Sequence, residues 1–378
     1  MSLVYIVTGE QSGDRHAADI VKGLKKEAND FTYKGITGPA LQAEGVQQLI
    51  SIDQLSVMGL TDVIKAIPRL LKTFFKIRNA ITQENPKLVL LVDSPSFNLR
   101  LARSLRKKGY QGQIIQYISP SIWAWGAERK ALMASTLNLL MTIYPFEKKH
   151  FEGTNLRVEY VGNPLANQIQ HSKPNTQWRQ QVGIPLNAPL ISLFPGSRKG
   201  EILRNLPLML QAATQHTQYH IAISAANPEC KKLIELLLKE LSITATIVPV
   251  EIAHYELMRE SRAAIAKSGT VTLELALCGC PTVVIYQLTS LNRWFAKNIL
   301  KVKLPWYCIV NILFENQLFP EYIVNTPSKE SISRSLSTLL QDGPVRDQIL
   351  QGCRKIQELL SDQKFSKNPS QLIAESIN

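Results

Sequence analysis

Short apolar runs rich in β-branched residues alternate along this chain with amphipathic stretches of helical period. In the first half, the predicted strands are residues 4–8, 33–36, 88–92, 114–118, 139–143 and 158–161. The predicted helices between them are residues 15–26, 64–82, 97–108 and 127–134. The run at 88–92 is apolar at every position, which is typical of a parallel strand covered on both faces. The first half is therefore predicted to form a parallel sheet between helices.

The same alternation restarts after a polar segment, residues 167–187, which is rich in Gln and Asn and contains Pro174 and Pro185. New predicted strands follow at residues 190–194, 220–224, 245–248, 263–266 and 282–286. We interpret the polar segment as a linker. The pattern then predicts two Rossmann-like, doubly wound α/β domains that face a cleft, residues 1–167 and 186–360.

Positive charge is concentrated in two parts of the chain. The 378 residues include 43 Lys and Arg against 30 Asp and Glu, a formal net charge of +13. Residues 57–109 carry +8 and residues 288–304 carry +4, so these segments hold almost all of the excess. Such concentration is typical of contact with nucleic acid or with an anionic membrane surface.

Composition and spacing exclude several classes of protein. A hydrophobic fraction of 45% is too high for a disordered chain. No apolar run reaches the ~18–20 residues of a membrane-spanning helix, and the first residues lack the basic region of a secretory signal. The five cysteines are odd in number and irregularly spaced, which argues against a disulfide framework and a zinc site. We therefore expect a soluble or peripheral protein of the reducing cytoplasm.

The loop after the first predicted strand is the first candidate for a ligand site, because ligands of open α/β sheets bind beyond the carboxyl ends of the strands. Residues 9–14 read GEQSGD. The two glycines allow a ligand to approach the backbone closely, and Glu10 and Asp14 offer carboxylates. A tight turn in which Ser12 or Asp14 caps the next helix is the alternative.

Two further loops follow predicted strands in the first half. Asp93 comes directly after the strand at 88–92, where many α/β enzymes have a catalytic base. Capping of the next helix is the alternative for Asp93. Residues 119–125 read SPSIWAW, and the two tryptophans are candidates either for stacking on a sugar or base or for core packing. The segment around Asp93 has no Asp-x-Asp pair, so it does not predict a chelated metal.

Two loops of the second half combine glycine, hydroxyls and positive charge at predicted helix N-termini. They contain Gly196, Ser197 and Arg198 in the first loop, and Ser268, Gly269 and Thr270 in the second. Each loop alone is compatible with plain helix capping, but together they favour a nucleotide diphosphate. Glu274 lies one turn further along the second helix, where its carboxylate is placed to bind a ribose diol.

Seven segments together resemble the lipid-A-disaccharide synthase family. They are residues 9–14 (GEQSGD), 93–98 (DSPSFN), 119–125 (SPSIWAW), 144–147 (YPFE), 161–164 (VGNP), 195–201 (PGSRKGE) and 268–274 (SGTVTLE). The resemblance spans nearly the whole chain, and SPSIWAW is its most specific motif. It implies the GT-B architecture of two Rossmann-like domains.

The resemblance implies an inverting glycosyltransferase of lipid A biosynthesis. Such an enzyme joins UDP-2,3-diacylglucosamine to 2,3-diacylglucosamine 1-phosphate at the cytoplasmic face of the inner membrane, and releases UDP. It needs no metal or other cofactor. Two alternatives stay open: another GT-B enzyme, such as a UDP-GlcNAc epimerase or a different lipid-linked glycosyltransferase, and a non-catalytic lipid-binding protein of the same fold. Whether the chain forms a homodimer is also open.

The resemblance also implies roles for individual residues. Asp93 would take the proton of the acceptor's 6-hydroxyl, and Glu10 would assist. The UDP-binding residues would be Gly196, Ser197, Arg198, Ser268, Gly269, Thr270, Glu274 and Asn311. The acceptor loops would contribute Gly9, Ser12, Gly13, Asp14, Ser121, Trp123 and Trp125. The family often has His where Asn163 stands, so the role of that residue and the acyl-chain preference stay open. A C-terminal helix within 361–378 is expected to pack back on the first domain.

The basic segments resemble membrane-contacting helices. The basic residues of the first are Lys65, Arg69, Lys72 and Lys76, at helical spacing, and its aromatic residues are Phe74 and Phe75. An interfacial helix is predicted, and packing of its apolar face on the sheet is the alternative. Arg293, Trp294, Lys297 and Lys301 repeat the chemistry in the second segment. No nucleic-acid recognition motif accompanies the charge, so anionic lipids of the inner membrane are the favoured partner.

Overall fold

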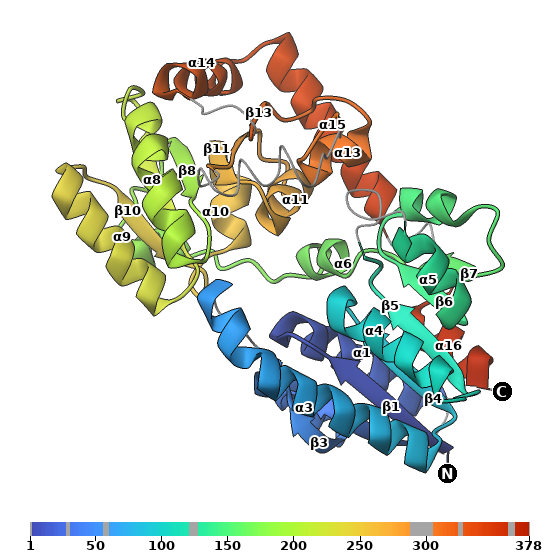
Figure 1. The fold of residues 1–378 in the computed structure, drawn as a ribbon. Coiled ribbons are helices and arrows are strands. Elements are labelled where there is room, and N and C mark those ends of the chain that lie inside the picture. The colour runs from blue at the N-terminus through green and yellow to red at the C-terminus, as the bar shows by residue number, and fades with distance from the viewer. Residues whose placement is uncertain are drawn as a thin grey trace. The chain divides into compact units, whose positions relative to one another are not determined.

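The structure is a computed structural model that describes residues 2–27, 31–55, 60–120, 128–287, 305–323, 328–361 and 367–377. The chain divides into two compact units, one made of Met1–Pro164 with Asp362–Asn378 and the other of Leu165–Ser361. Each unit is a parallel sheet with helices packed on it (Figure 1). The predicted fold class, two doubly wound α/β domains, is confirmed.

The first unit is built on a seven-stranded parallel sheet with the order β3-β2-β1-β4-β5-β6-β7. Its strands are β1 (Ser2–Thr8), β2 (Phe31–Thr37), β3 (Gln47–Ser51), β4 (Leu88–Val92), β5 (Gln113–Tyr117), β6 (Leu139–Thr142) and β7 (Arg157–Tyr160). Successive strands add outward in both directions from the neighbouring pair β1 and β4. The switch point of the sheet, where ligands of such folds bind, therefore lies between these two strands.

Helices cover both faces of this sheet. One face packs against α1 (Gln11–Glu27) and α16 (Pro369–Ile377), and the other against α3 (Leu60–Glu84), α4 (Pro95–Lys107) and α5 (Glu128–Thr136). The short elements are α2 (Pro39–Ala43), η1 (Ile52–Gln54) and η2 (Pro145–Phe151). Alternate side chains of a strand point to opposite faces, so Val4 and Ile6 join the core beneath α1 while Tyr5 and Val7 join the core beneath α3.

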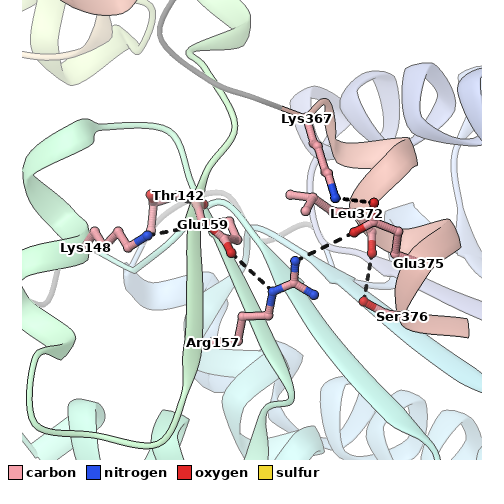
Figure 2. Close-up of polar contacts among 8 residues, drawn as sticks. All are labelled: Thr142, Lys148, Arg157, Glu159, Lys367, Leu372, Glu375 and Ser376. Atoms are coloured by element: carbon pink, nitrogen blue, oxygen red, sulfur yellow. Dashed lines mark hydrogen bonds and ion pairs between the residues drawn. The ribbon is translucent and has the colours of Figure 1, made fainter.

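The C-terminal helix α16 lies against α1 and beside β7. The Ser370 hydroxyl donates a hydrogen bond of 3.0 Å to the carbonyl of Ile20 in α1. On the surface, Arg157 of β7 forms an ion pair with Glu375 of α16, and Glu375 also pairs with Lys367 (Figure 2). The two ends of the first unit's sequence are thus joined by packing and by charge.

The second unit contains a six-stranded parallel sheet with the order β10-β9-β8-β11-β12-β13. Its strands are β8 (Leu190–Phe194), β9 (His220–Ala225), β10 (Thr246–Pro249), β11 (Ser261–Lys267), β12 (Thr282–Ile285) and β13 (Glu321–Tyr322). Its helices are α6 (Pro164–Gln170), α7 (Trp178–Val182), α8 (Lys199–Ala213), α9 (Pro228–Leu241), α10 (Tyr255–Glu260), α11 (Thr270–Leu277), α13 (Ile309–Phe314), α14 (Lys329–Leu340) and α15 (Pro344–Leu360). The loops after β8 and β11 open at one edge, since these strands are neighbours.

The polar segment at 167–187 is not a free linker, and this corrects the prediction. The Trp178 side chain is 1% exposed and belongs to the core of the second unit. Its indole N–H donates a hydrogen bond of 2.7 Å to Glu260. A single large aromatic residue therefore anchors a segment whose average composition is typical of a linker.

Candidate functional site

The loops that follow β1 and β4 contact each other at the carboxyl edge of the first sheet. Thr8 and Val92, the last residues of the two strands, are register partners. A Cβ atom on Gly9 would lie 1.6 Å from Oγ of Ser94, so only glycine fits at position 9. The two predicted loops therefore pack directly against each other.

Asp93 and Ser94 form a left-handed turn at the end of β4. Their φ angles are 51° and 43°, in a region that non-glycine residues rarely adopt. Two such residues in succession cost roughly 1–3 kcal/mol each, and conformations of this kind concentrate at functional sites. The helix α4 begins at Pro95 with Ser94 as its N-cap, so Asp93 does not cap that helix.

The Asp93 carboxyl group is half-buried at the end of β4. Burial raises the pKa of this carboxyl group above its usual range, and a hydrogen bond from the backbone of Ser94 partly offsets the rise. A raised pKa makes a carboxylate a better proton acceptor. The backbone carbonyl of Asp93 accepts hydrogen bonds from the side chains of Asn98 and Gln116, two residues that sequence reasoning missed.

The loop after β1 divides into exposed and buried residues. Glu10 and Ser12 are exposed, whereas Gly13 and Asp14 are buried. The two carboxylate oxygens of Asp14 accept hydrogen bonds of 2.6 and 2.8 Å from the backbone N–H groups of Gly38 and Ala40, at the start of α2. Asp14 thus caps a helix, although not its own, and its predicted contact with the acceptor is disfavoured. Glu10 keeps its carboxylate at the surface.

Part of the predicted site lies outside the described residues. These residues are Ser121, Trp123 and Trp125 after β5, and Arg293, Trp294, Lys297 and Lys301 in the second basic segment. Within the motif at residues 119–125, the described residues are Ser119 and Pro120. Ser119 is buried, and its hydroxyl donates to the carbonyl of Pro120.

In the second unit, the loop after β8 presents exposed polar groups. Ser197 and Arg198 are both exposed, and Arg198 is the N-cap of α8. Gly196 has φ of 115°, and a Cβ atom there would lie 2.5 Å from Oε2 of Glu201. The same Glu201 oxygen accepts a hydrogen bond of 3.2 Å from the Ser197 N–H. Glycine is needed at 196 because the buried Glu201 side chain holds this turn from beneath.

The loop after β11 is joined to the β8 loop by an ion pair. Nζ of Lys267, the last residue of β11, lies 3.1 Å from Oε1 of Glu201. Ser268 is half-buried, and Gly269 and Thr270 are exposed at the start of α11. The structure therefore brings the two predicted phosphate loops together. Sequence reasoning missed Lys267, although it directly precedes the motif.

Glu274 and Asn311 have partners within the chain. Oε2 of Glu274 lies 3.3 Å from Nε2 of His254, a residue that the sequence left without a role. Asn311 is fully buried; its side-chain N–H groups donate to Phe319 and Glu321, and its oxygen accepts from the N–H groups of Leu318 and Phe319. This amide has no hydrogen-bonding capacity left for a ligand, so its predicted UDP contact is disfavoured and its place is to hold the segment around β13.

Comparison with known proteins places the chain in a family. The model of the family described as lipid-A-disaccharide synthetase matches residues 4–376. A lipid-A-disaccharide synthase of Chlamydia trachomatis is 35% identical over 368 residues, which are 96% of this chain and 60% of that protein. One of Myxococcus xanthus is 32% identical over 383 residues, 99% of this chain and 97% of the relative. The chain belongs to the lipid-A-disaccharide synthetase family.

This membership confirms the resemblance carried by the seven motifs. The chain spans about 60% of the length of the chlamydial relatives that it matches. Solved structures with the same fold include the UDP-GlcNAc 2-epimerase of Neisseria meningitidis bound to UDP-GlcNAc, with a TM-score of 0.63, 14% identity and 99% of both chains covered. The glycotransferase of kitacinnamycin has a TM-score of 0.62 at 11% identity, with 100% of this chain and 99% of the other covered. Both likenesses concern the fold alone.

The helix α3 of this family member has an apolar stripe at its surface. Ile67, Leu71 and Phe75, spaced by one turn each, are 45%, 50% and 46% exposed. Three of the predicted basic residues of the helix, Arg69, Lys72 and Lys76, are exposed as well, and Arg78 is half-buried. The side chain of Lys65 lies outside the described part. Basic and apolar side chains thus share the outer surface of α3.

The opposite face of α3 packs on the first sheet. Ile77 and Ile81 are fully buried in its core. Phe74 is only half-buried, and its ring meets that of Phe97 edge to face at 5.7 Å. Phe74 thus packs part of its ring against the first unit whereas Phe75 is exposed, and the membrane contact of both stays a prediction. The structure thus shows the packing on the sheet that the sequence gave as the alternative, and an interfacial role for the outer face of α3 stays a prediction.

Among the described residues, no helix has both the length and the apolar character that a membrane-spanning segment requires. Among the same residues, no group of three or more His, Cys, Asp or Glu side chains is arranged to hold a metal ion.

Proposed function

We propose that this chain is a lipid-A-disaccharide synthase, which condenses UDP-2,3-diacylglucosamine with 2,3-diacylglucosamine 1-phosphate. The products are UDP and the lipid A disaccharide 1-phosphate. The observation that carries the proposal is the half-buried Asp93 on its left-handed turn at the switch point of the first sheet, within a chain that matches the family from residue 4 to residue 376.

Asp93 is the general base of the proposed reaction. As the bond between the anomeric carbon and the diphosphate breaks, the acceptor's 6-hydroxyl oxygen forms the new glycosidic bond and its proton passes to the Asp93 carboxylate. The diphosphate leaves with the electron pair of the broken bond. One displacement at the anomeric carbon inverts its configuration. Glu10, exposed in the adjoining loop, orients the acceptor.

The loops after β8 and β11 bind the UDP group. The exposed guanidinium of Arg198 suits bidentate contact with a phosphate, and Ser197, Gly269 and Thr270 offer hydroxyl or backbone N–H donors. Fixed donors and positive charge stabilise the diphosphate as it acquires negative charge. Glu274, held by His254, binds the ribose diol.

The outer surface of α3 docks the protein on the anionic cytoplasmic face of the inner membrane. Its exposed stripe of Ile67, Leu71 and Phe75 would enter the interface while the flanking basic residues contact phosphate groups. Both proposed substrates carry acyl chains, so an enzyme held at the bilayer meets them where they reside. This location also explains why basic residues gather in one segment of the first unit.

The deciding experiment is incubation of the purified chain with both lipid substrates in detergent micelles, with UDP release and disaccharide formation measured together. Release of UDP only when both substrates are present supports the proposal. No UDP release, or release without disaccharide, refutes it. UDP-GlcNAc alone serves as the control, because its conversion without acceptor would indicate an epimerase instead.

A further inference from the structure

Three residues with left-handed backbone lie at the carboxyl ends of the neighbouring strands β4 and β5. The φ angles are 51° at Asp93, 43° at Ser94 and 68° at Ile118. None of these residues is glycine, and for a β-branched residue such as Ile118 this conformation is a true outlier. Such a backbone persists only where its surroundings enforce it.

Two fully buried carboxamides bind the carbonyl groups of these turns. Nδ2 of Asn98 donates to the carbonyl oxygen of Asp93 at 2.7 Å and to that of Val92 at 3.2 Å. Nε2 of Gln116 lies 3.2 Å from the same Asp93 oxygen and 3.1 Å from the carbonyl oxygen of Ile118. Gln116 therefore links the two turns, and both amides converge on the carbonyl of Asp93.

The orientation of both amides is determined by the carbonyl groups around them. With either amide flipped, its oxygen would face carbonyl oxygens and these hydrogen bonds would be lost. In the observed orientation, Oδ1 of Asn98 and Oε1 of Gln116 have no hydrogen-bond partner among the described residues, although both side chains are 0% exposed. Each amide therefore keeps one buried acceptor without a partner while its nitrogen serves the carbonyl groups of the turns, and an apolar replacement would leave those carbonyls without these donors.

We propose that Asn98 and Gln116 are positioning residues, which fix the direction of the Asp93 carboxylate by holding the backbone carbonyl of the same residue. The proposal rests on the function proposed above for Asp93. A base displaced by ~1 Å from its productive position loses on the order of 100-fold in rate. The two amides join the Asp93 turn to the Ile118 turn, and Ser94 of the first turn packs directly against Gly9.

The test compares Asn98→Leu and Gln116→Met, which remove the donors and keep the volume, with the wild-type chain. We expect kcat per folded molecule to fall about 30- to 100-fold in each variant, while KM for the UDP-sugar stays within about twofold. A purely structural role would lower the amount of folded protein and leave kcat per folded molecule unchanged.

The matched control is Tyr110→Phe. The hydroxyl of Tyr110 is buried and donates a hydrogen bond of 2.8 Å to the carbonyl of Pro86, close to the amino ends of the same strands β4 and β5. This variant loses a buried hydrogen bond in the same core without touching the turn. We expect a lower melting temperature with an unchanged kcat.

A double-mutant cycle separates positioning from a direct contact with substrate. In the Asp93→Asn background, Gln116→Met should not lower the residual rate further, because the base that it positions is gone. A full multiplicative loss in that background would overturn the proposal. So would a folded Gln116→Met variant with wild-type kcat.

A second variant covers the case in which Gln116→Met does not fold. Ser94→Gly removes the strain at one residue of the turn, since glycine adopts positive φ freely. The doubly substituted chain is expected to fold and to turn over at least 30-fold more slowly than Ser94→Gly alone. Equal rates would overturn the inference. If the wild-type chain itself releases no UDP, the proposed function is refuted and this inference with it. If the wild-type chain is active and the two rates are equal, only the inference is refuted.

Discussion

Each unit has polar loops at the carboxyl edge of its own parallel sheet, but the two units hold these loops in different ways. In the first unit, a half-buried carboxylate stands on a left-handed turn that two neutral, buried amides support. In the second unit, an ion pair between Glu201 and Lys267 supports two loops whose serine, threonine and arginine residues are largely exposed.

This difference fits the different chemical tasks proposed for the two units. A proton acceptor benefits from removal of water, which burial provides here, and from a fixed direction, which neutral amides can provide without lowering the pKa of the carboxyl group. A site for a dianionic diphosphate needs accessible donors and net positive charge, and a buried ion pair beneath the loops fixes them without neutralising the exposed Arg198. The comparison predicts that changes in the first unit alter the rate of the chemical step, while changes in the second alter binding of the donor.

The largest effect is expected from Asp93→Asn. Removal of the base should lower kcat by roughly 10²- to 10⁴-fold while UDP binding remains intact. Rates of UDP release and UDP affinity by calorimetry measure the two parts. Asp53→Asn, an exposed acid of the same unit, is the control and should keep full activity. An Asp93→Asn enzyme with near wild-type turnover would refute the assignment of the base.

Replacement of the apolar stripe on α3 is expected to abolish membrane association. Ile67→Ser, Leu71→Ser and Phe75→Ser combined should reduce partition onto anionic vesicles at least ~100-fold, because each buried side chain contributes about 1.5–3 kcal/mol. Flotation at low and high salt measures it. The control combines serine substitutions at exposed apolar residues of the second unit, Leu186, Leu236 and Val345. Equal losses in both triple variants would contradict the assignment of lipid contact to α3.

Arg198→Ala tests the second half of the comparison. We expect kcat/KM for the UDP-sugar to fall by roughly 10- to 100-fold, since a charge-assisted hydrogen bond contributes about 1.5–3 kcal/mol. The melting temperature should not change, because Arg198 is exposed. Arg334→Ala, also exposed in the second unit, should leave kinetics unchanged. Loss of thermal stability with unaltered kinetics would show that Arg198 serves the fold.

A smaller effect is expected from Lys267→Met, which leaves the buried Glu201 carboxylate without its ion-pair partner. The free energy of unfolding should fall by about 1–3 kcal/mol, because the pair is largely but not fully desolvated. Adding Glu201→Gln should restore part of this loss, since the remaining charge is removed. Chemical denaturation of the two single variants and the double variant measures the coupling. Additive losses would show that the two residues stabilise the loops independently.

The smallest effect is expected on thermal stability, when Asp93→Asn is compared with the wild type at different pH values. Burial raises the pKa of Asp93 above its ordinary value of 3.8, so the folded protein binds this proton more tightly than the unfolded chain. The protonated Asp93 side chain therefore contributes its full stability to the fold below pH 3.8. This contribution is lost as the pH rises through the raised pKa. Asp93→Asn should unfold at a higher temperature than wild type at pH 7, with a difference that shrinks on acidification. A variant less stable at pH 7 would contradict this sign.

Sequence periodicity predicted the buried strands well and the polar ones poorly. The residues predicted at 88–92 and 190–194 coincide with β4 (Leu88–Val92) and β8 (Leu190–Phe194). Both are buried at every position and almost entirely apolar, with Ser192 of β8 the exception, because helices cover both of their faces. The edge strand β3 (Gln47–Ser51) was missed, since it begins with two exposed glutamines and lacks the apolar run. Its strand conformation depends on pairing with β2.

Asp14 and Asn311 show where residue type and motif position mislead. Each is a polar residue in or near a predicted ligand loop, yet its side chain is occupied by backbone groups of its own unit. The partners of Asp14, Gly38 and Ala40, are more than twenty residues away in the chain. Without the fold, a carboxylate that caps a distant helix cannot be distinguished from one that binds substrate.

The sequence by itself determined the order of strands and helices, the loops at the ends of the strands and the chemistry that these loops offer. Apolar periodicity and local motifs encode all three, because each depends on neighbouring residues. Only the tertiary structure decided that Gln116 reaches the carbonyl of Asp93, that Lys267 pairs with Glu201 and that α3 keeps Ile67, Leu71 and Phe75 at its surface. These contacts depend on which strands are adjacent and which helix face the sheet covers, and packing of the whole unit fixes both.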